Sequence, residues 1–169
     1  LEMGDTPTGF FARLEPCRLL QPGDRLGPLN AALMAFLDEE YGTGFGPLTP
    51  GFKIVPYADA DAVEKAITPH TAAVIVEPIQ GEGGIHVGTD DYLRGLRRLC
   101  DERGVLLIFD EVQTGLGRTG TWFGYQHAGV TPDIMTLAKA LGGGVSIGAM
   151  MAQPEIAKAL VPGTHASTF

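Results

Sequence analysis

Residues 72–111 decide the fold, and they read AAVIVEPIQGEGGIHVGTDDYLRGLRRLCDERGVLLIFDE. The stretch begins with a continuous apolar run at 72–76 and ends with a second run at 105–109. Short apolar runs bounded by turn residues are typical of strands that are buried on both faces. Between the runs, leucines recur at the spacing of one face of a helix. The stretch therefore predicts strand, helix and strand, a unit that crosses over right-handedly in a parallel sheet.

The helix of this unit carries signals for both of its ends. Thr89 is a suitable N-cap, and Asp90 and Asp91 suit the positive end of the helix dipole. Gly104 follows the last apolar position, where a glycine in the left-handed conformation commonly ends a helix.

Similar signals extend the alternation on both sides of the unit. We expect strands at 53–56, 134–138 and 148–152, and helices at 31–40, 61–67 and 154–160. Prolines and glycines punctuate residues 1–30, so we expect a loop or a poorly ordered arm there. The predicted class is α/β, with an open and mostly parallel sheet.

The composition is that of a globular protein. The chain has 169 residues, of which 44% are hydrophobic, and 12 Lys and Arg against 20 Asp and Glu give a net charge of −8. This length corresponds to about one domain. The acidic balance argues against a nucleic-acid partner, because a general phosphate-backbone binder needs clustered basic residues.

The remaining composition signals favour a cytoplasmic protein with no membrane partner and no metal. Two cysteines are too few for a disulfide framework, and Cys100 is expected to be a small buried side chain. No apolar run approaches the ~20 residues that span a bilayer, and the N-terminus lacks the pattern of a secretory leader. The four histidines show no metal-ligand spacing.

Charged residues follow three of the predicted strands at the point where each strand ends. Glu77 follows the first strand, Asp110 and Glu111 follow the second, and Lys139 follows the third. In open α/β sheets, ligands bind beyond the carboxyl ends of the strands, so we expect these side chains to meet at one edge. The glycines at 142–144 leave room there for a ligand or a backbone to approach closely.

Three kinds of chemistry would suit such an edge. The run 106–111 has the form of a magnesium-binding ATPase strand, but the chain contains no Gly-Lys pair for the phosphate loop of those enzymes. The segment 115–120 matches G-x-G-x-x-G, but no tight strand-to-helix turn surrounds it, which disfavours dinucleotide binding. The third is pyridoxal phosphate chemistry, in which a lysine forms a Schiff base with the cofactor aldehyde and an acid keeps the pyridine nitrogen protonated.

Four stretches carry a resemblance to a known family. They are VEPIQGEGG at 76–84, FDEVQTGLGRTG at 109–120, PDIMTLAKALGGG at 132–144 and GTHASTF at 163–169. Together they resemble the class-III aminotransferases, which are fold-type-I pyridoxal phosphate enzymes. The resemblance covers residues 44–169 and implies part of the large cofactor-binding domain, with residues 1–43 as a divergent arm that is loop-rich or short-helical.

Within that family, the motifs resemble most the branch that acts on acetylornithine. This resemblance implies transfer of an amino group between N2-acetylornithine, or an ornithine-like amine, and 2-oxoglutarate, a step of arginine biosynthesis. The branches that act on ornithine and on 4-aminobutyrate are the alternatives.

The resemblance also implies roles for the residues at the sheet edge. Lys139 would be the Schiff-base lysine and Asp110 the partner of the pyridine nitrogen. Val112 would pack on the cofactor ring and Gln113 would bond its 3′-oxygen, with Glu111 counted among the cofactor-binding residues.

Substrate and subunit contacts follow from the same resemblance. Glu77 and Glu82 would lie beside the substrate. Ser167 and Thr168 look like the pair that serves the neighbouring subunit's site, the serine for substrate and the threonine for the cofactor phosphate. Two such residues imply a homodimer with a shared active site. The family resemblance implies small amino acid and 2-oxo acid substrates.

The chain departs from the family pattern at several places. We find no glycine-rich phosphate loop upstream of Gly44, the chain stops at Phe169 before a small C-terminal domain, and Ser146 stands where proline is common. We therefore expect a partial aminotransferase segment that is inactive or very feeble alone. The alternative is a non-catalytic remnant or interaction protein.

Overall fold

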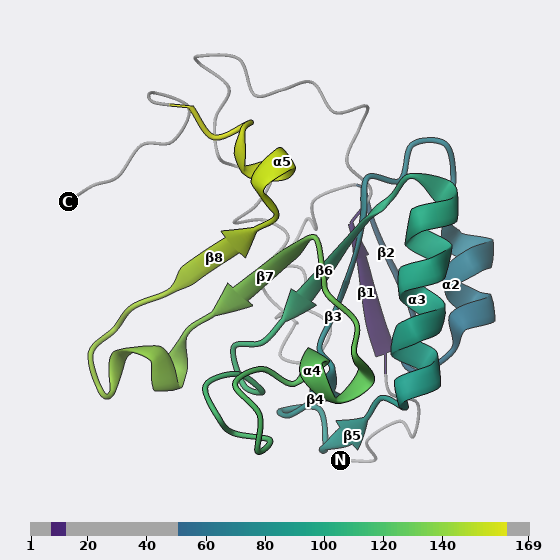
Figure 1. The fold of residues 1–169 in the computed structure, drawn as a ribbon. Helices are drawn as coiled ribbons and strands as arrows, with labels where there is room; N and C mark the ends of the chain where they lie inside the picture. Colours follow the sequence, from purple (N-terminus) through teal and green to yellow (C-terminus); the bar gives the residue numbers. More distant parts are fainter. Residues whose placement is uncertain (1–7, 13–50, 162–169) are drawn as a thin grey trace, which may run out of the picture.

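A computed structural model describes residues 8–12 and 51–161, in which a sheet carries helices on one face (Figure 1). Within these residues the main sheet has six strands in the order β2-β1-β3-β6-β7-β8. These strands are β1 Thr8–Ala12, β2 Phe52–Pro56, β3 Ala73–Val76, β6 Leu106–Asp110, β7 Ile134–Leu137 and β8 Ala149–Ala152. A separate hairpin pairs β4 Ile79–Gln80 with β5 His86–Val87. The helical elements are α2 Ala60–Ala66, α3 Asp90–Arg103, α4 Tyr125–Ala128, η1 Lys139–Gly142 and α5 Pro154–Ala157.

The centre of the sheet is parallel, and it contains the predicted strand–helix–strand unit. β3 and β6 pair in parallel with α3 between them in sequence, and β6 pairs in parallel with β7. The predicted α/β class is therefore confirmed. The parallel direction brings the carboxyl ends of β3, β6 and β7 to one side of the molecule, where the β4–β5 hairpin and α4 also lie (Figure 1).

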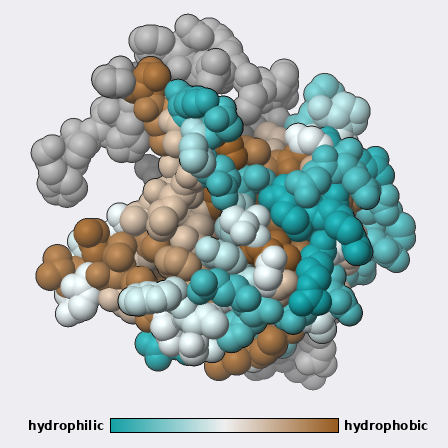
Figure 2. All heavy atoms as spheres, in the orientation of Figure 1, coloured by the Kyte–Doolittle hydropathy of each residue, from teal (hydrophilic) through white to brown (hydrophobic). Residues whose placement is uncertain are grey.

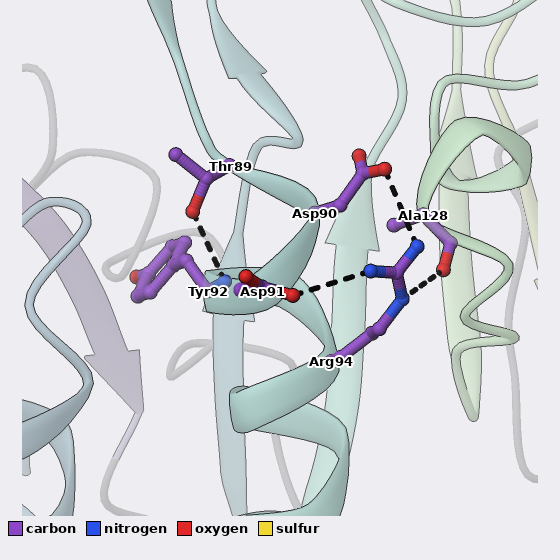
Figure 3. A network of polar contacts seen from close by, with 6 residues as sticks. All are labelled: Thr89, Asp90, Asp91, Tyr92, Arg94 and Ala128. Atoms are coloured by element: carbon purple, nitrogen blue, oxygen red, sulfur yellow. Dashed lines mark hydrogen bonds and ion pairs between the residues drawn. The ribbon is translucent and has the colours of Figure 1, made fainter.

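The ends of α3 form as the sequence predicts. The Thr89 hydroxyl accepts a hydrogen bond of 3.1 Å from the Tyr92 N–H, and Gly104 ends the helix with a φ of 65°. Arg94 pairs with the aspartates of the first turn and donates to the carbonyl of Ala128 in α4 at 2.9 Å (Figure 3). The same arginine therefore supports the start of α3 and fixes α4 against it.

The core lies between the sheet and the helices α2 and α3. Val63 of α2, Leu96 of α3 and Leu107 and Phe109 of β6 are all at most 1% exposed. Burying an aliphatic or aromatic side chain of this size stabilises the fold by about 1.5–3 kcal/mol. Cys100 belongs to the same core and is fully buried, as predicted. None of the helices in the described part of the chain is long and apolar enough to cross a membrane.

Asp133 anchors the start of β7 to the rest of this core. Its Oδ2 atom accepts a bond of 2.8 Å from the Arg97 guanidinium and one of 2.7 Å from the Leu107 N–H. The guanidinium comes from α3 and the N–H from β6, so one carboxylate ties a helix and a strand to the segment that leads to Lys139.

Two expectations about the strands outside the parallel centre are wrong. Residues 8–12 were expected in a loop, but they form β1, which is antiparallel to both β2 and β3. The last strand, β8, was expected to continue the parallel alternation, but it runs antiparallel to β7. The connection between β7 and β8 contains only the short η1 turn and a loop, and parallel neighbours need a longer crossover.

The surface divides into a polar and an apolar part (Figure 2). Hydrophilic side chains cover the outward sides of α2 and α3, as expected for amphipathic helices. Hydrophobic side chains gather around η1 and the loop to β8, where Val145 and Ile147 are 73% and 52% exposed. The predicted helix at 31–40 lies outside the described residues, and α5 is shorter than the predicted 154–160.

Candidate active site

The structure brings three of the predicted site residues together at the sheet edge. Glu77 directly follows β3, Asp110 ends β6 and Lys139 begins η1 two residues after β7. Glu77 is close enough to interact electrostatically with Asp110, with Lys139 and with Glu82. Two acids and a lysine thus lie at the same end of three parallel strands.

Glu77 is a perturbed acid in this group. Burial raises its pKa, the hydrogen bond from the Gly81 N–H lowers it, and the charges of Asp110 and Lys139 act in opposite directions. The bond from the Gly81 N–H to Glu77 Oε2 is 3.2 Å long. A half-buried carboxyl with a raised pKa, next to a lysine, is common at functional sites.

Asp110 is held in one orientation by the turn that follows it. Its Oδ1 atom accepts a hydrogen bond of 2.9 Å from the N–H of Val112, two residues along the chain. This short turn leaves acceptor capacity on the carboxylate, because an ionised carboxyl offers about four lone-pair sites. The group can therefore bind the turn and still accept from a ligand.

Gln113 and the loop after β4 are packed against one another. A Cβ atom added to Gly81 would lie 2.7 Å from Cδ of Gln113, closer than real Cβ contacts allow. A side chain at position 81 would therefore displace the end of the Gln113 side chain from where the structure places it. Val112 and Gln113 are both partly exposed, so their side chains are available to a ligand.

Glu111 is directed into the protein rather than toward this edge. It is 1% exposed, and its carboxylate accepts bonds of 2.8 Å from the N–H groups of Gly124 and Tyr125. A third bond comes from the hydroxyl of Thr114. The side chain fixes the loop that follows Gln113, a role that the sequence does not indicate because its partners lie many residues downstream.

The 115–120 glycine segment lies within this loop. The chain makes turns there, and the next helix begins only at Tyr125. Dinucleotide binding is therefore excluded as a reading of this segment, since the fingerprint requires a strand, a tight turn and a helix in direct succession.

Lys139 has an unusual backbone. Its φ is 48°, in the left-handed region, and its side chain is exposed. That conformation costs a non-glycine residue about 1–2 kcal/mol, and such strain is typical of functional positions. Gly143 ends η1, so the lysine stands at the start of a short, tight turn with little side-chain bulk beyond it.

Thr136 is a further residue at this edge, and no motif in the sequence points to it. It is paired with Asp110 in the register of β6 and β7. Its Oγ1 atom is buried and has no hydrogen-bond partner within the part of the chain that the structure describes. Its position three residues before Lys139 is visible in the sequence, but its pairing with Asp110 is visible only in the register.

These residues fit pyridoxal phosphate. An exposed lysine, a fixed carboxylate with spare acceptor capacity and a buried hydroxyl without a partner are the kinds of group that a cofactor with an aldehyde and a basic ring nitrogen requires. Ser167 and Thr168 lie outside the described residues.

Comparison with known proteins identifies the family. The profile of class-III aminotransferases matches residues 27–169. The chain belongs to this family. Class-III aminotransferases depend on pyridoxal phosphate, in agreement with the fit of the site. The match starts at residue 27, upstream of Gly44, so the resemblance extends further toward the N-terminus than the motifs indicate.

Individual aminotransferases are also similar to this chain in sequence. The chain is 60% identical over 143 residues to an acetylornithine aminotransferase of Methanocaldococcus jannaschii, covering 85% of this chain and 36% of that protein. An acetylornithine aminotransferase of Bradyrhizobium diazoefficiens is 55% identical, with 85% and 35% covered. The chain thus spans about a third of the length of these relatives.

Solved aminotransferase structures share the fold. An ornithine aminotransferase from Toxoplasma gondii superposes with a TM-score of 0.73 at 48% identity, covering 77% of this chain and 31% of that one. In that structure PLP partially occupies the active site. An N-acetylornithine aminotransferase from Stenotrophomonas maltophilia gives a TM-score of 0.60 at 46% identity, with 65% and 31% covered.

Proposed function

We propose that this chain is the cofactor-holding part of an aminotransferase that moves an amino group from N2-acetylornithine, or a similar amine, to 2-oxoglutarate. The observation that carries the proposal is the meeting of Glu77, Asp110 and Lys139 at one sheet edge. The acetylornithine aminotransferases that are 60% and 55% identical to the chain support this amino donor. Arginine biosynthesis is the corresponding pathway.

Lys139 and Asp110 would bind the reactive parts of the cofactor, its aldehyde and its ring nitrogen. Bound pyridoxal phosphate would supply an aldehyde that takes up the substrate amine and a ring that accepts electron density. The Lys139 Nζ amine would hold the aldehyde between reactions and, when released, would take a proton from the carbon that bears the substrate amine. The Asp110 carboxylate, oriented by the Val112 N–H, would keep the ring nitrogen protonated.

The neighbouring residues would orient the cofactor and the substrate. Val112 would cover one side of the ring, and Gln113, whose place is kept open by Gly81, would donate to the ring oxygen. Glu77 and Glu82 would lie on the substrate side, where the raised pKa of Glu77 favours its neutral form more than usual. Glu111 would act indirectly, by fixing the loop that follows Gln113.

A shared site in a homodimer is part of the proposal. Ser167 and Thr168 would serve the neighbouring subunit, the threonine toward the cofactor phosphate and the serine toward the substrate. Since the matched part is only about a third of the length of each relative, turnover is proposed for a protein of their length. Cofactor binding is the property to test on the chain itself.

The decisive experiment is chemical trapping of the cofactor. The purified chain is mixed with pyridoxal phosphate, reduced with borohydride and digested with a protease. The masses of the peptides are then measured by mass spectrometry. We expect the cofactor mass on the peptide that contains Lys139. The Lys139→Ala variant should lose this label, and Lys65→Ala, which removes a lysine of α2, should keep it.

Two results would contradict the proposal. Labelling spread evenly over the lysines, and unchanged by Lys139→Ala, would show adventitious reaction of exposed amines. Absence of any label at millimolar cofactor would favour a non-catalytic role for this chain.

A further inference from the structure

The strongest unexplained feature at the site is the hydroxyl of Thr136. Thr136 is a half-buried residue of β7, and its Oγ1 atom is buried without a hydrogen-bond partner among the described residues. A buried donor that stays unpaired destabilises a fold, so such groups are rare and usually have a reason. A valine, which has nearly the same shape, would avoid this cost in a strand.

The register places Thr136 next to Asp110. Asp110 and Thr136 are Cα partners in the parallel pairing of β6 with β7. Paired residues of neighbouring strands project from the same face of a sheet, within reach of one another's side chains. Thr136 is therefore a lateral neighbour of the carboxylate that the proposed function assigns to the ring nitrogen.

The backbone fixes this neighbourhood firmly. The Glu111 N–H donates to the Thr136 carbonyl at 3.0 Å, so the two strands remain bonded directly at the end of β6. The bond from the Val112 N–H occupies Oδ1 of Asp110. The carboxylate keeps further lone pairs, and a threonine hydroxyl has one proton to donate.

We propose that Thr136 is a positioning residue for Asp110, whose hydroxyl donates to that carboxylate when the cofactor is bound. The bond would hold the carboxylate in line with the ring nitrogen and would stabilise its ionised form. Thr136 would thereby act on the cofactor only through Asp110. The inference rests on the proposed function, because it assumes that Asp110 receives a pyridine nitrogen.

The test separates cofactor affinity from the stability of the protein. Thr136→Val removes the hydroxyl and keeps the shape, Thr136→Ser keeps the hydroxyl, and Thr131→Val changes an exposed threonine as the matched control. For each variant the dissociation constant of pyridoxal phosphate is measured by titration. The urea midpoint of the cofactor-free protein is measured in parallel.

A positioning role predicts that Thr136→Val weakens cofactor binding without lowering the urea midpoint. Thr136→Val should bind the cofactor about tenfold or more weakly, since a hydrogen bond to a charged group is lost. The urea midpoint of that variant should be unchanged or higher, because an unpaired buried hydroxyl is removed. Thr136→Ser should bind within about threefold of the wild type, and Thr131→Val should bind equally well.

Other results would overturn the inference in distinguishable ways. Wild-type affinity in Thr136→Val would show that the hydroxyl does not act on Asp110. A lowered urea midpoint in Thr136→Val, with no recovery of affinity in Thr136→Ser, would show a purely structural residue. Failure of the wild-type chain to bind cofactor would overturn the proposed function and, with it, this inference.

Discussion

Glu111 accepts a hydrogen bond of 2.8 Å from the N–H of Gly124, thirteen residues further along the chain. The same carboxylate also accepts from Tyr125 and Thr114. Glu111 follows the Asp110 carboxylate directly, so consecutive residues have separate tasks. One faces the sheet edge and the other holds the loop that begins behind it.

Removal of the Glu111 carboxylate should loosen this loop. Glu111→Ala leaves buried N–H donors without an acceptor, and we expect the free energy of unfolding to fall by about 2–4 kcal/mol. Glu111→Gln retains an acceptor and should cost less. Urea denaturation measures both values, and tryptic cleavage after the exposed Arg118 should become faster in the alanine variant. Equal cleavage rates in the two variants would contradict the assigned role.

Leu96 tests the core between α3 and the sheet. The side chain is 0% exposed, so Leu96→Ala should lower the free energy of unfolding by about 2–5 kcal/mol. Leu160→Ala makes the same change at a residue that is 54% exposed and should cost much less. Urea unfolding curves of the two variants provide the comparison. A similar loss in both would show that α3 does not pack as described.

Cys100 should be chemically inert in the folded protein. Burial raises the pKa of its thiol to about 12, and only the thiolate is an effective nucleophile. In a Cys17→Ser background, Cys100 is the remaining cysteine of the chain. We expect no reaction with iodoacetamide under native conditions at about pH 8, and rapid alkylation in urea. Fast alkylation of the native protein would mean that α3 opens readily.

Glu77 should make stability depend on pH. Burial raises its pKa above the ordinary value of 4.5, so the folded state holds the proton more tightly than the unfolded state. Its contribution to stability therefore declines as the pH rises from the unfolded pKa through the folded one. Glu77→Gln lacks this titration and retains an acceptor for Gly81. The stability of Glu77→Gln relative to wild type should increase between about pH 4 and about pH 7.

Urea unfolding at several pH values measures this difference. A difference that shrinks toward neutral pH would mean that Lys139 and the Gly81 N–H outweigh burial at this carboxyl.

Gly81 and Gly83 form a matched pair for testing the place of Gln113. In Gly81→Ala the new methyl would collide with the Gln113 side chain, whereas in Gly83→Ala its nearest neighbour would be Cβ of Gln80 at 4.0 Å. If Gln113 contacts the cofactor, Gly81→Ala should weaken pyridoxal phosphate binding by about five- to tenfold, the value of one hydrogen bond. Gly83→Ala should bind as the wild type does, and equal weakening by both would assign the effect to the loop.

Local sequence patterns were sufficient for the centre of this fold. The ends of α3 follow from Thr89 and Gly104, and the apolar runs before Glu77 and Asp110 coincide with β3 and β6 to within one residue at either end. The strand ends then determine which charged residues meet. For that reason the grouping of Glu77, Asp110 and Lys139 was predictable without knowing any distance.

Features that depend on distant pairing could not be predicted in this way. The strand β1 is a strand because β2 and β3 bond to it on both sides, and residues 8–12 alone are too short to indicate this. The same applies to the direction of β8 and to the loop-binding role of Glu111. The position of Thr136 beside Asp110 likewise follows from the strand register and not from any local pattern.

The left-handed backbone of Lys139 has a consequence for how relatives of this chain diverge. Glycine would adopt a φ of 48° without strain, so Lys139→Gly would relieve the backbone while removing the amine that the proposed function assigns to the cofactor. A lineage released from selection for amino transfer would therefore meet no structural resistance to glycine at this position. On the proposed function, lysine stands here for its amine and against the conformational preference of the backbone.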